Sequence, residues 1–246
     1  MYESFAYIYD EMMLEVNYQA WVAYIENIFC QYAIDPKVLA DLACGTGNIT
    51  IPMAERGYNI IGVDRSEDML LVAQEKARKQ GLKIPFVCQD IRDIDLHKSV
   101  DAVLVMCDGI NYILEDRDLD RVFSGIYNIL KPGGILIFDI SSYYKLSTVL
   151  GNNTIADNDQ DISLIWQNHY DHKKDICTMD LTFFVEENSL YRRFDEVHIQ
   201  KAYGDQYIIE KLKYNKYCNI NSYDDLSFNA IKCNSQRIFF VAQRQL

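Results

Sequence analysis

The stretch that decides the fold runs Val38-Leu39-Ala40-Asp41-Leu42-Ala43-Cys44-Gly45-Thr46-Gly47-Asn48-Ile49-Thr50. Its first residues form a short apolar run behind a proline, which is typical of a buried parallel strand. Residues 48–56 then predict a helix that ends at Gly57. Gly45 and Gly47 lack a Cβ, so the backbone between strand and helix can pass close to a ligand. Free N–H groups at the helix N-terminus would face a negative group on that ligand.

The spacing of the two glycines separates two kinds of cofactor. A nicotinamide-binding turn carries G-x-G-x-x-G, but the third glycine position here holds Thr50. Asp41 also puts a carboxylate at the strand end, where it would repel a pyrophosphate and attract an ammonium group. The segment from Asp41 to Gly47 resembles motif I of the class I S-adenosylmethionine-dependent methyltransferases. Because the third glycine of the nicotinamide-binding turn is replaced by Thr50, the sequence argues against an NAD-dependent oxidoreductase.

Length and composition fit a globular α/β protein. The chain has 246 residues, of which 49% are hydrophobic and 24% charged, enough for one large domain or a domain with an insertion. It has no run of 18 apolar residues and no basic-then-apolar N-terminus. Seven cysteines without a C-x-x-C pair favour a reducing cytoplasm. The net charge of −12 argues against nucleic acid as the substrate.

Two further strands are predicted to end in acids. Residues 59–63 lead to Asp64, which can accept hydrogen bonds from ribose hydroxyls. Met69, one turn into the next helix, is either a neighbour of the adenine or an ordinary core residue. Residues 86–88 lead to Asp90 and Ile91. The resemblance implies that Asp90 accepts from the adenine amino group and that Ile91 offers a backbone N–H to the ring.

The N-terminal pattern Y-x-x-F-A-x-x-Y-D contains Tyr2, Phe5, Tyr9 and Asp10. On composition alone, it is an aromatic patch that docks the N-terminus. Many small-molecule methyltransferases open with this pattern, and the resemblance implies that Tyr9 lies over the cofactor near the reacting methyl.

The fourth predicted strand, residues 102–106, leads into Cys107-Asp108-Gly109-Ile110-Asn111-Tyr112. Methyltransferases that act on base amines or glutamine usually carry Asn/Asp-Pro-Pro-aromatic there, and this motif is absent. No Pro-Cys nucleophile is present either, and a buried cysteine at a strand end is usually structural. Both absences favour a small-molecule acceptor.

The second half of the chain predicts the rest of the sheet and an insertion. A helix is predicted over 118–130 and a strand over 135–140. The Leu130-Lys131-Pro-Gly-Gly turn before that strand resembles a further family signature, in which the glycines permit the turn. From about residue 161 the hydrophobic period becomes two, which predicts three antiparallel strands. After a helix over 204–213, residues 216–220 and 237–243 predict a closing antiparallel pair. Residues 151–158 are the most linker-like stretch.

These elements predict a Rossmann-like class I methyltransferase fold with a mostly parallel sheet and an antiparallel last strand. The core is expected to be residues 1–150 and 203–246, with residues 160–202 as an antiparallel β lid over the carboxyl ends of the parallel strands. The insertion could instead form a dimer interface, because a three-stranded sheet has open edges. We expect a monomer or a homodimer.

His198 lies in Glu196-Val197-His198, late in the last insertion strand. A lone strand histidine is usually structural, but histidine also has a pKa suited to a general base near neutral pH. The chain resembles, nearly end to end, the amino-sugar N,N-dimethyltransferases, which share this E-x-H. It resembles at least as closely bacterial proteins known only as methyltransferases, so the resemblance does not imply a sugar substrate. His169 and His172 lack a third ligand at a usable spacing, so no metal site is predicted.

The sequence therefore predicts transfer of the S-adenosylmethionine methyl group to a nitrogen or oxygen of a small molecule. The alternatives are a tRNA-modifying methyltransferase and a non-catalytic S-adenosylmethionine-binding protein. The predicted cofactor residues are Tyr9, Asp41, Ala43, Gly45, Gly47, Asp64, Arg65, Met69, Asp90, Ile91 and Cys107. The predicted catalytic residues are His198, Asp108 and Tyr112, with Tyr143 and Tyr144 also on the substrate side.

Overall fold

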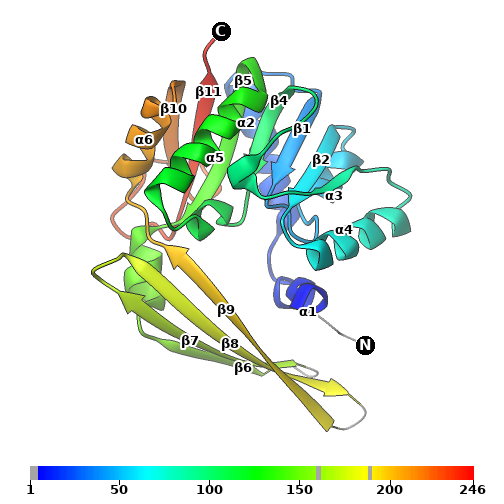
Figure 1. Ribbon diagram of the computed structural model, residues 1–246, viewed down its shortest axis with the longest axis vertical. Coiled ribbons are helices and arrows are strands. Elements are labelled where there is room, and N and C mark those ends of the chain that lie inside the picture. Colours follow the sequence, from blue (N-terminus) through cyan, green and yellow to red (C-terminus); the bar gives the residue numbers. More distant parts are fainter. Residues whose placement is uncertain (1–4, 159–161, 188–189) are drawn as a thin grey trace.

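The computed structural model describes residues 5–158, 162–187 and 190–246. Tyr2 of the N-terminal pattern and residues 160–161 at the start of the predicted insertion lie outside the described residues. Two sheets make up the framework: a large mixed sheet, and a smaller antiparallel sheet beside the ends of its strands (Figure 1).

The large sheet has seven strands in the order β10-β11-β5-β4-β1-β2-β3. β1 to β5 are parallel, and β11 runs antiparallel to both β5 and β10. This topology confirms the predicted Rossmann-like sheet with an antiparallel last strand. The strands are β1 (Val38–Leu42), β2 (Asn59–Asp64), β3 (Phe86–Cys88), β4 (Val100–Val105), β5 (Leu130–Ser141), β10 (Tyr217–Asp224) and β11 (Arg237–Arg244).

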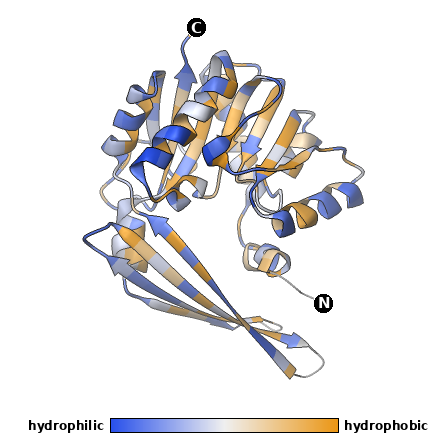
Figure 2. Ribbon diagram, viewed as in Figure 1, coloured by the Kyte–Doolittle hydropathy of each residue, from blue (hydrophilic) through white to orange (hydrophobic). Residues whose placement is uncertain are grey.

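Helices cover both faces of this sheet, so its central strands are hydrophobic on both sides (Figure 2). Phe123 and Ile208 pack with Leu42 and Phe138 on the face covered by α5 and α6. On the other face, Ile25 of α2 lies in a second cluster. The helices are α2 (Tyr18–Gln31), α3 (Thr50–Glu55), α4 (Glu67–Lys79), α5 (Asp116–Ile129) and α6 (Asp205–Tyr214).

Capping residues fix where two of these helices begin. The Asn17 side chain accepts from the Ala20 N–H, and Ser66 accepts from the Met69 N–H at the start of α4. The Ser66 cap sets the start of α4 directly after Arg65, in a loop that lines the cavity described below.

The small sheet consists of β6 (Thr154–Asn158), β7 (Ile162–Asp171), β8 (Ile176–Glu187) and β9 (Leu190–Lys201) in sequence order. All neighbours are antiparallel, which confirms the three predicted strands. The prediction of a linker over 151–158 was wrong, because β6 pairs with β7 there. β6 is an exposed edge strand and carries no buried face that alternation could reveal.

A short N-terminal helix, α1 (Phe5–Met12), packs against the small sheet. Ile8 of α1 joins Leu146 and Leu150, of the π-helical turn η3 (Lys145–Leu150), in a cluster with Leu181 and Phe183 of β8. α1 is also bonded to the glycine turn after β1 and to α4, as described below. Two 3₁₀ turns complete the structure, η1 (Ile91–Asp93) and η2 (Gly109–Tyr112). No helix within the described ranges is long and apolar enough to cross a membrane.

Candidate cofactor and acceptor site

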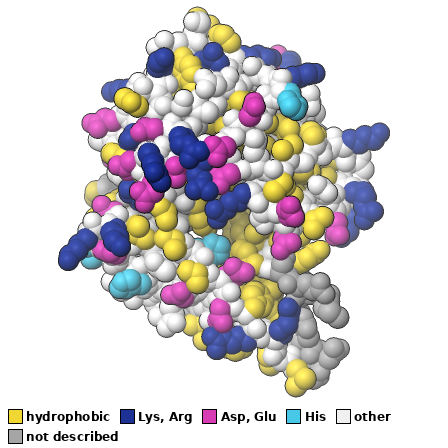
Figure 3. Space-filling view, in the orientation of Figure 1, with side chains coloured by type: hydrophobic (Ala, Val, Ile, Leu, Met, Phe, Trp, Pro, Cys, Tyr) yellow, Lys and Arg dark blue, Asp and Glu magenta, His cyan; other side chains and the backbone are white. Residues whose placement is uncertain are grey.

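A cavity of about 710 Å³ lies between the carboxyl ends of the parallel strands and strand β9. The space-filling view shows a hollow with hydrophobic side chains between the two parts of the molecule (Figure 3). Most of the predicted site residues line the cavity. Those from the cofactor set are Tyr9, Asp41, Ala43, Gly45, Asp64, Arg65, Met69, Asp90, Ile91 and Cys107, and those from the catalytic set are Tyr112 and His198.

Asp41, at the end of β1, is a buried acid at the base of the cavity. Its side chain is 1% exposed and accepts a hydrogen bond of 2.5 Å from the Thr50 hydroxyl. Burial raises the pKa of Asp41 to about 7. A cationic group bound nearby would favour the ionised form, so this acid fits the ammonium of an amino-acid moiety.

Asp64 organises the glycine turn from the end of β2. One carboxylate oxygen accepts from the Gly45 N–H at 2.8 Å and the other from the Ser66 N–H at 2.9 Å. A Cβ on Gly45 would meet no atom within 4 Å, because the residue faces open space. A carboxylate has about four acceptor sites, so Asp64 keeps capacity for ribose hydroxyls.

Gly47 was predicted as a cofactor residue but is not one of those that line the cavity. A Cβ there would lie 3.2 Å from Ile51 Cδ1 and 3.3 Å from Ala73 Cβ. Its φ of +81° and its contacts with α3 and α4 therefore explain the glycine. The expectation that Gly47 lets the backbone approach a ligand is not supported.

The ends of β1 and β4 turn sharply beneath the cavity. Ala43 and Cys107 have φ values of +54° and +58°, which non-glycine residues rarely adopt. Burial raises the pKa of the Cys107 thiol, which keeps the sulfur protonated. Cys107 therefore has the properties of a wall residue and not those of a nucleophile.

Asp90 and its neighbours line the end of the cavity beside β3. The Asp90 carboxylate forms an ion pair with Arg92, in which Nη2 lies 2.5 Å from Oδ2. Hydrogen bonds from Arg92 lower the pKa of Asp90. The sequence predicted Asp90 as an acceptor for the adenine amino group but did not predict Arg92, which also lines the cavity.

His198 of β9 and Tyr112 of η2 meet at the cavity. The Tyr112 hydroxyl lies 2.9 Å from His198 Nδ1, and the Phe5 ring centroid lies 5.3 Å from that of His198. His198 Nε2 is buried and has no hydrogen-bond partner among the described residues. Burial lowers the pKa of His198, so the neutral ring is favoured near neutral pH. If Nδ1 carries the proton and donates to Tyr112, Nε2 keeps a lone pair and can accept a proton.

The matches to known proteins agree with this cavity. A family model described as a methyltransferase domain matches residues 39–134. YqeM of Bacillus subtilis (strain 168), named as a candidate methyltransferase, is 37% identical over 99% of this chain and 97% of its own. This chain belongs to the methyltransferase family.

Solved structures identify the cofactor. A crystal structure of an S-adenosylmethionine-dependent methyltransferase from Clostridium acetobutylicum ATCC 824 superposes with a TM-score of 0.91 at 36% identity, covering 100% of this chain and 99% of the other. The sugar N-methyltransferase KedS8 from Streptoalloteichus sp. ATCC 53650 shares the fold, with a TM-score of 0.81 at 19% identity over 98% of this chain and 93% of its own. The methyltransferase therefore uses S-adenosylmethionine, as the sequence predicted, and the acids on β1 and β2 suit its ammonium and ribose groups.

The N-terminal helix of the methyltransferase is tied to the glycine turn by Asp10. Its carboxylate accepts from Thr46 Oγ1 at 2.6 Å, from Asn48 Nδ2 at 3.0 Å and from Lys76 Nζ at 2.6 Å. These bonds bring Tyr9 to the cavity. The sequence pattern contained Asp10, but its partners are distant in the chain and could not be read from spacing.

Glu196 also lines the cavity, although the sequence did not predict it as a site residue beside His198 in the E-x-H triplet. It lies two residues before His198, and burial raises its pKa. No ion pair to Glu196 occurs among the described side chains. It is therefore an acid on the acceptor side without a cationic partner.

Asp108 does not line the cavity, contrary to its predicted place on the substrate side. Its carboxylate accepts from Gln200 Nε2 at 2.6 Å and from Arg237 Nη1 at 3.0 Å, and its N–H donates to Asp139. Arg237 also forms an ion pair with Asp139 and lies over the ring of Trp21. Asp108 therefore joins β9 to the core through a buried network.

The remaining predicted candidates also lie away from the cavity. Tyr143 packs against Tyr170, and Tyr144 precedes the π-helical turn. His172 packs against Tyr170 as well. Within the described ranges, no group of three or more His, Cys, Asp or Glu side chains could hold a metal ion.

Proposed function

We propose that this methyltransferase transfers the methyl group to a nitrogen or oxygen of a small molecule, with His198 as the general base. The observation that carries the proposal is the pair of Tyr112 and His198 at the cavity, with Nε2 unpaired in the described structure. The acids that suit the cofactor lie at the opposite wall, so the acceptor would lie between the two groups.

The cofactor supplies an electrophilic methyl group on a sulfonium, so the protein mainly has to align a nucleophile and take its proton. His198 is suited to the second task because its lowered pKa keeps it neutral. Tyr112 would hold the ring through Nδ1 and direct Nε2 toward the acceptor. Tyr9, kept protonated by burial, would form the wall beside the methyl group.

The second sheet supports a small acceptor. β9 lines one side of the cavity, and α1 closes another through Phe5 and Tyr9. We propose that residues 160–202 serve as a lid attached to a core of residues 1–150 and 203–246. Such a lid would leave room for a small molecule beside the cofactor and would limit the access of a macromolecule.

The alternative of a tRNA substrate has less support. The net charge is −12, and the Lys and Arg side chains that gather on the face in Figure 3 are interspersed with Asp and Glu. The contact between Tyr112 and His198 at the cavity supports a catalytic protein over a non-catalytic one. A location in the cytoplasm and a monomeric or homodimeric state remain predictions.

The test is a transfer assay with S-adenosylmethionine labelled in its methyl group. Primary and secondary amines, amino sugars, phenols and alcohols are offered in parallel with unmodified tRNA, and label is followed in each fraction by mass spectrometry. The proposal predicts label on one small-molecule class and none on tRNA. Label on tRNA alone would contradict it.

A further inference from the structure

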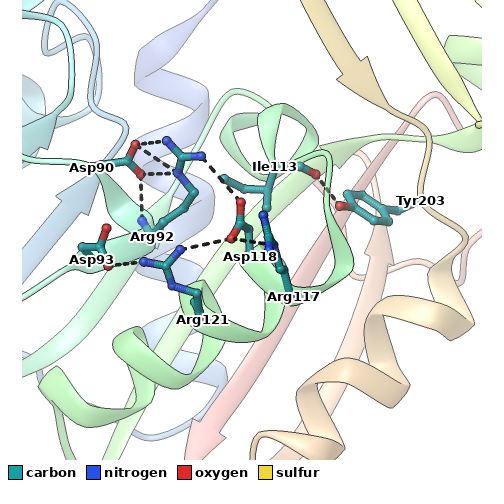
Figure 4. A network of polar contacts seen from close by, with 8 residues as sticks. All are labelled: Asp90, Arg92, Asp93, Ile113, Arg117, Asp118, Arg121 and Tyr203. Atoms are coloured by element: carbon teal, nitrogen blue, oxygen red, sulfur yellow. Dashed lines mark hydrogen bonds and ion pairs between the residues drawn. The ribbon is translucent and has the colours of Figure 1, made fainter.

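Arg92 holds both oxygens of the Asp90 carboxylate at the β3 end of the cavity (Figure 4). Oδ1 accepts from the Arg92 backbone N–H and from Nε, each at 2.9 Å. Oδ2 accepts from Nη2 at 2.5 Å and more weakly from Nε at 3.1 Å. The carboxylate is therefore oriented by a two-pronged guanidinium contact and one backbone donor.

Arg92 is itself anchored to helix α5. Its Nη1 lies 3.5 Å from Asp118 Oδ2, and Asp118 also receives Arg121 Nη1 at 3.1 Å. Arg121 extends the chain of charges to Asp93 in η1 (Figure 4). The Asp118 side chain is only 12% exposed, so the anchor is largely shielded from water. The orientation of Asp90 thus depends on α5 as well as on its own loop.

These contacts leave one hydrogen-bond acceptor site on the Asp90 carboxylate. An ionised carboxylate offers about four acceptor sites, two on each oxygen. The backbone N–H and Nε fill both sites on Oδ1, and Nη2 fills one on Oδ2, where the Nε hydrogen adds only the weaker part of a shared contact at 3.1 Å. One acceptor site therefore remains, on Oδ2, and Asp90 lines the cavity.

We propose that Arg92 is a positioning residue that aims this last acceptor site of Asp90 at the exocyclic amino group of the adenine, and so sets the selectivity for a 6-amino purine. A 6-oxo purine would present a carbonyl oxygen to a fixed carboxylate, which repels it. A carboxylate without Arg92 could turn away from that oxygen, so selectivity would fall. The proposal rests on the adenine lying at the β3 end of the cavity.

The experiment measures the dissociation constants of S-adenosylhomocysteine and S-inosylhomocysteine by calorimetry. In the unmodified protein, we expect the 6-amino ligand to bind at least about tenfold more tightly, because a hydrogen bond to a charged acceptor is exchanged for repulsion. In Arg92→Gln, we expect the ratio of the two constants to fall to within about threefold. Arg92→Lys should give an intermediate ratio, because a lysine cannot make the two-pronged contact.

Two further variants separate positioning from general stability. Arg117→Gln removes an 85% exposed arginine that lies 3.9 Å from the same Asp118, and should leave the ratio unchanged. Asp118→Asn releases Arg92 from α5 without altering Asp90, and should lower the ratio if Arg92→Gln fails to fold. A parallel loss of affinity for both ligands in Arg92→Gln, with an unchanged ratio, would overturn the proposal. Failure of the unmodified protein to bind either ligand would instead overturn the placement of the cofactor, and the proposal with it.

Discussion

The two sides of the cavity are built in different ways. On the side proposed for the cofactor, Asp41 and Asp64 lie at the ends of β1 and β2 and Asp90 lies just after β3, so each acid is placed by its own strand. The acceptor side combines α1, η2 and β9, and Tyr112 meets His198 across 86 residues of chain. Short motifs therefore define the cofactor side, whereas the acceptor side exists only once the two sheets have packed together.

The largest expected effect of a single change is on the acceptor side. His198→Ala should lower turnover by about 10²–10⁴-fold, because a positioned base is lost, and should leave the affinity for S-adenosylhomocysteine unchanged. Turnover with the acceptor found in the transfer assay and calorimetry with S-adenosylhomocysteine measure the two quantities. His169→Ala, at an exposed position in the same sheet, is the matched control. Full activity in His198→Ala would assign His198 a structural role.

A change on the cofactor side should act on the affinity for S-adenosylhomocysteine. Asp64→Ala should weaken S-adenosylhomocysteine binding by at least about tenfold, because a charged acceptor for the ribose is lost along with the bonds to the glycine turn. Asp68→Ala, at an exposed position in the following helix, controls for the loss of one negative charge. Unchanged affinity in Asp64→Ala would remove Asp64 from the cofactor side.

The raised pKa of Asp41 gives the cofactor side a pH dependence. Below pH 7 the carboxyl is protonated and cannot pair with an ammonium, so affinity for S-adenosylhomocysteine should rise by up to about tenfold per pH unit toward pH 7 and then level off. Calorimetry from pH 5 to 8 measures this slope, and Asp41→Asn should abolish it. A slope that persists in Asp41→Asn would assign the titration to another group.

The same shift has a consequence for the unliganded protein. The folded state binds an extra proton between the ordinary value of 3.8 and about 7, so the contribution of Asp41 to stability falls as pH rises across this window. Denaturant unfolding at pH 5 and pH 8 should show a smaller decrease in Asp41→Asn than in the unmodified protein. An identical decrease in both would contradict the raised pKa.

The smallest expected effect is on the orientation of the base. Tyr112→Phe removes the hydroxyl at Nδ1 but keeps the ring, so turnover should fall by only about three- to tenfold, the range of one neutral hydrogen bond. The Michaelis constant for the acceptor and the affinity for S-adenosylhomocysteine should change little. A loss as large as that of His198→Ala would mean that Tyr112 contacts the reacting atoms directly.

The sequence predicted which strand-end acids come together, because the signals for them are local. Strand, glycine and acid stand within a few residues of each other, and the structure brings Asp41, Asp64 and Asp90 to one cavity. Gly45 and Gly47 are equivalent in the sequence pattern. In the structure, a Cβ on Gly47 would crowd Ile51 and Ala73, and the spacing of the motif does not reveal this packing.

The acceptor side was predicted in part. His198 and Tyr112 were found through resemblance, but their contact depends on how β9 packs against η2. Asp108 was misplaced because its carboxylate is held by Arg237, a residue 129 positions away. Arg92 was not predicted because an arginine that follows a strand-end acid is usually an ordinary surface charge. Only the structure shows its two-pronged contact with Asp90.

The measurement that most directly tests the separation of the cavity into a cofactor side and an acceptor side is a crystal structure with bound S-adenosylhomocysteine. The account predicts the ribose hydroxyls within hydrogen-bond distance of Asp64, the adenine beside Asp90 and Ile91, and the sulfur directed toward Tyr9 and the side of the cavity that holds His198. A ligand whose sulfur points away from His198, or whose ribose lies far from Asp64, would contradict the separation into a cofactor side and an acceptor side.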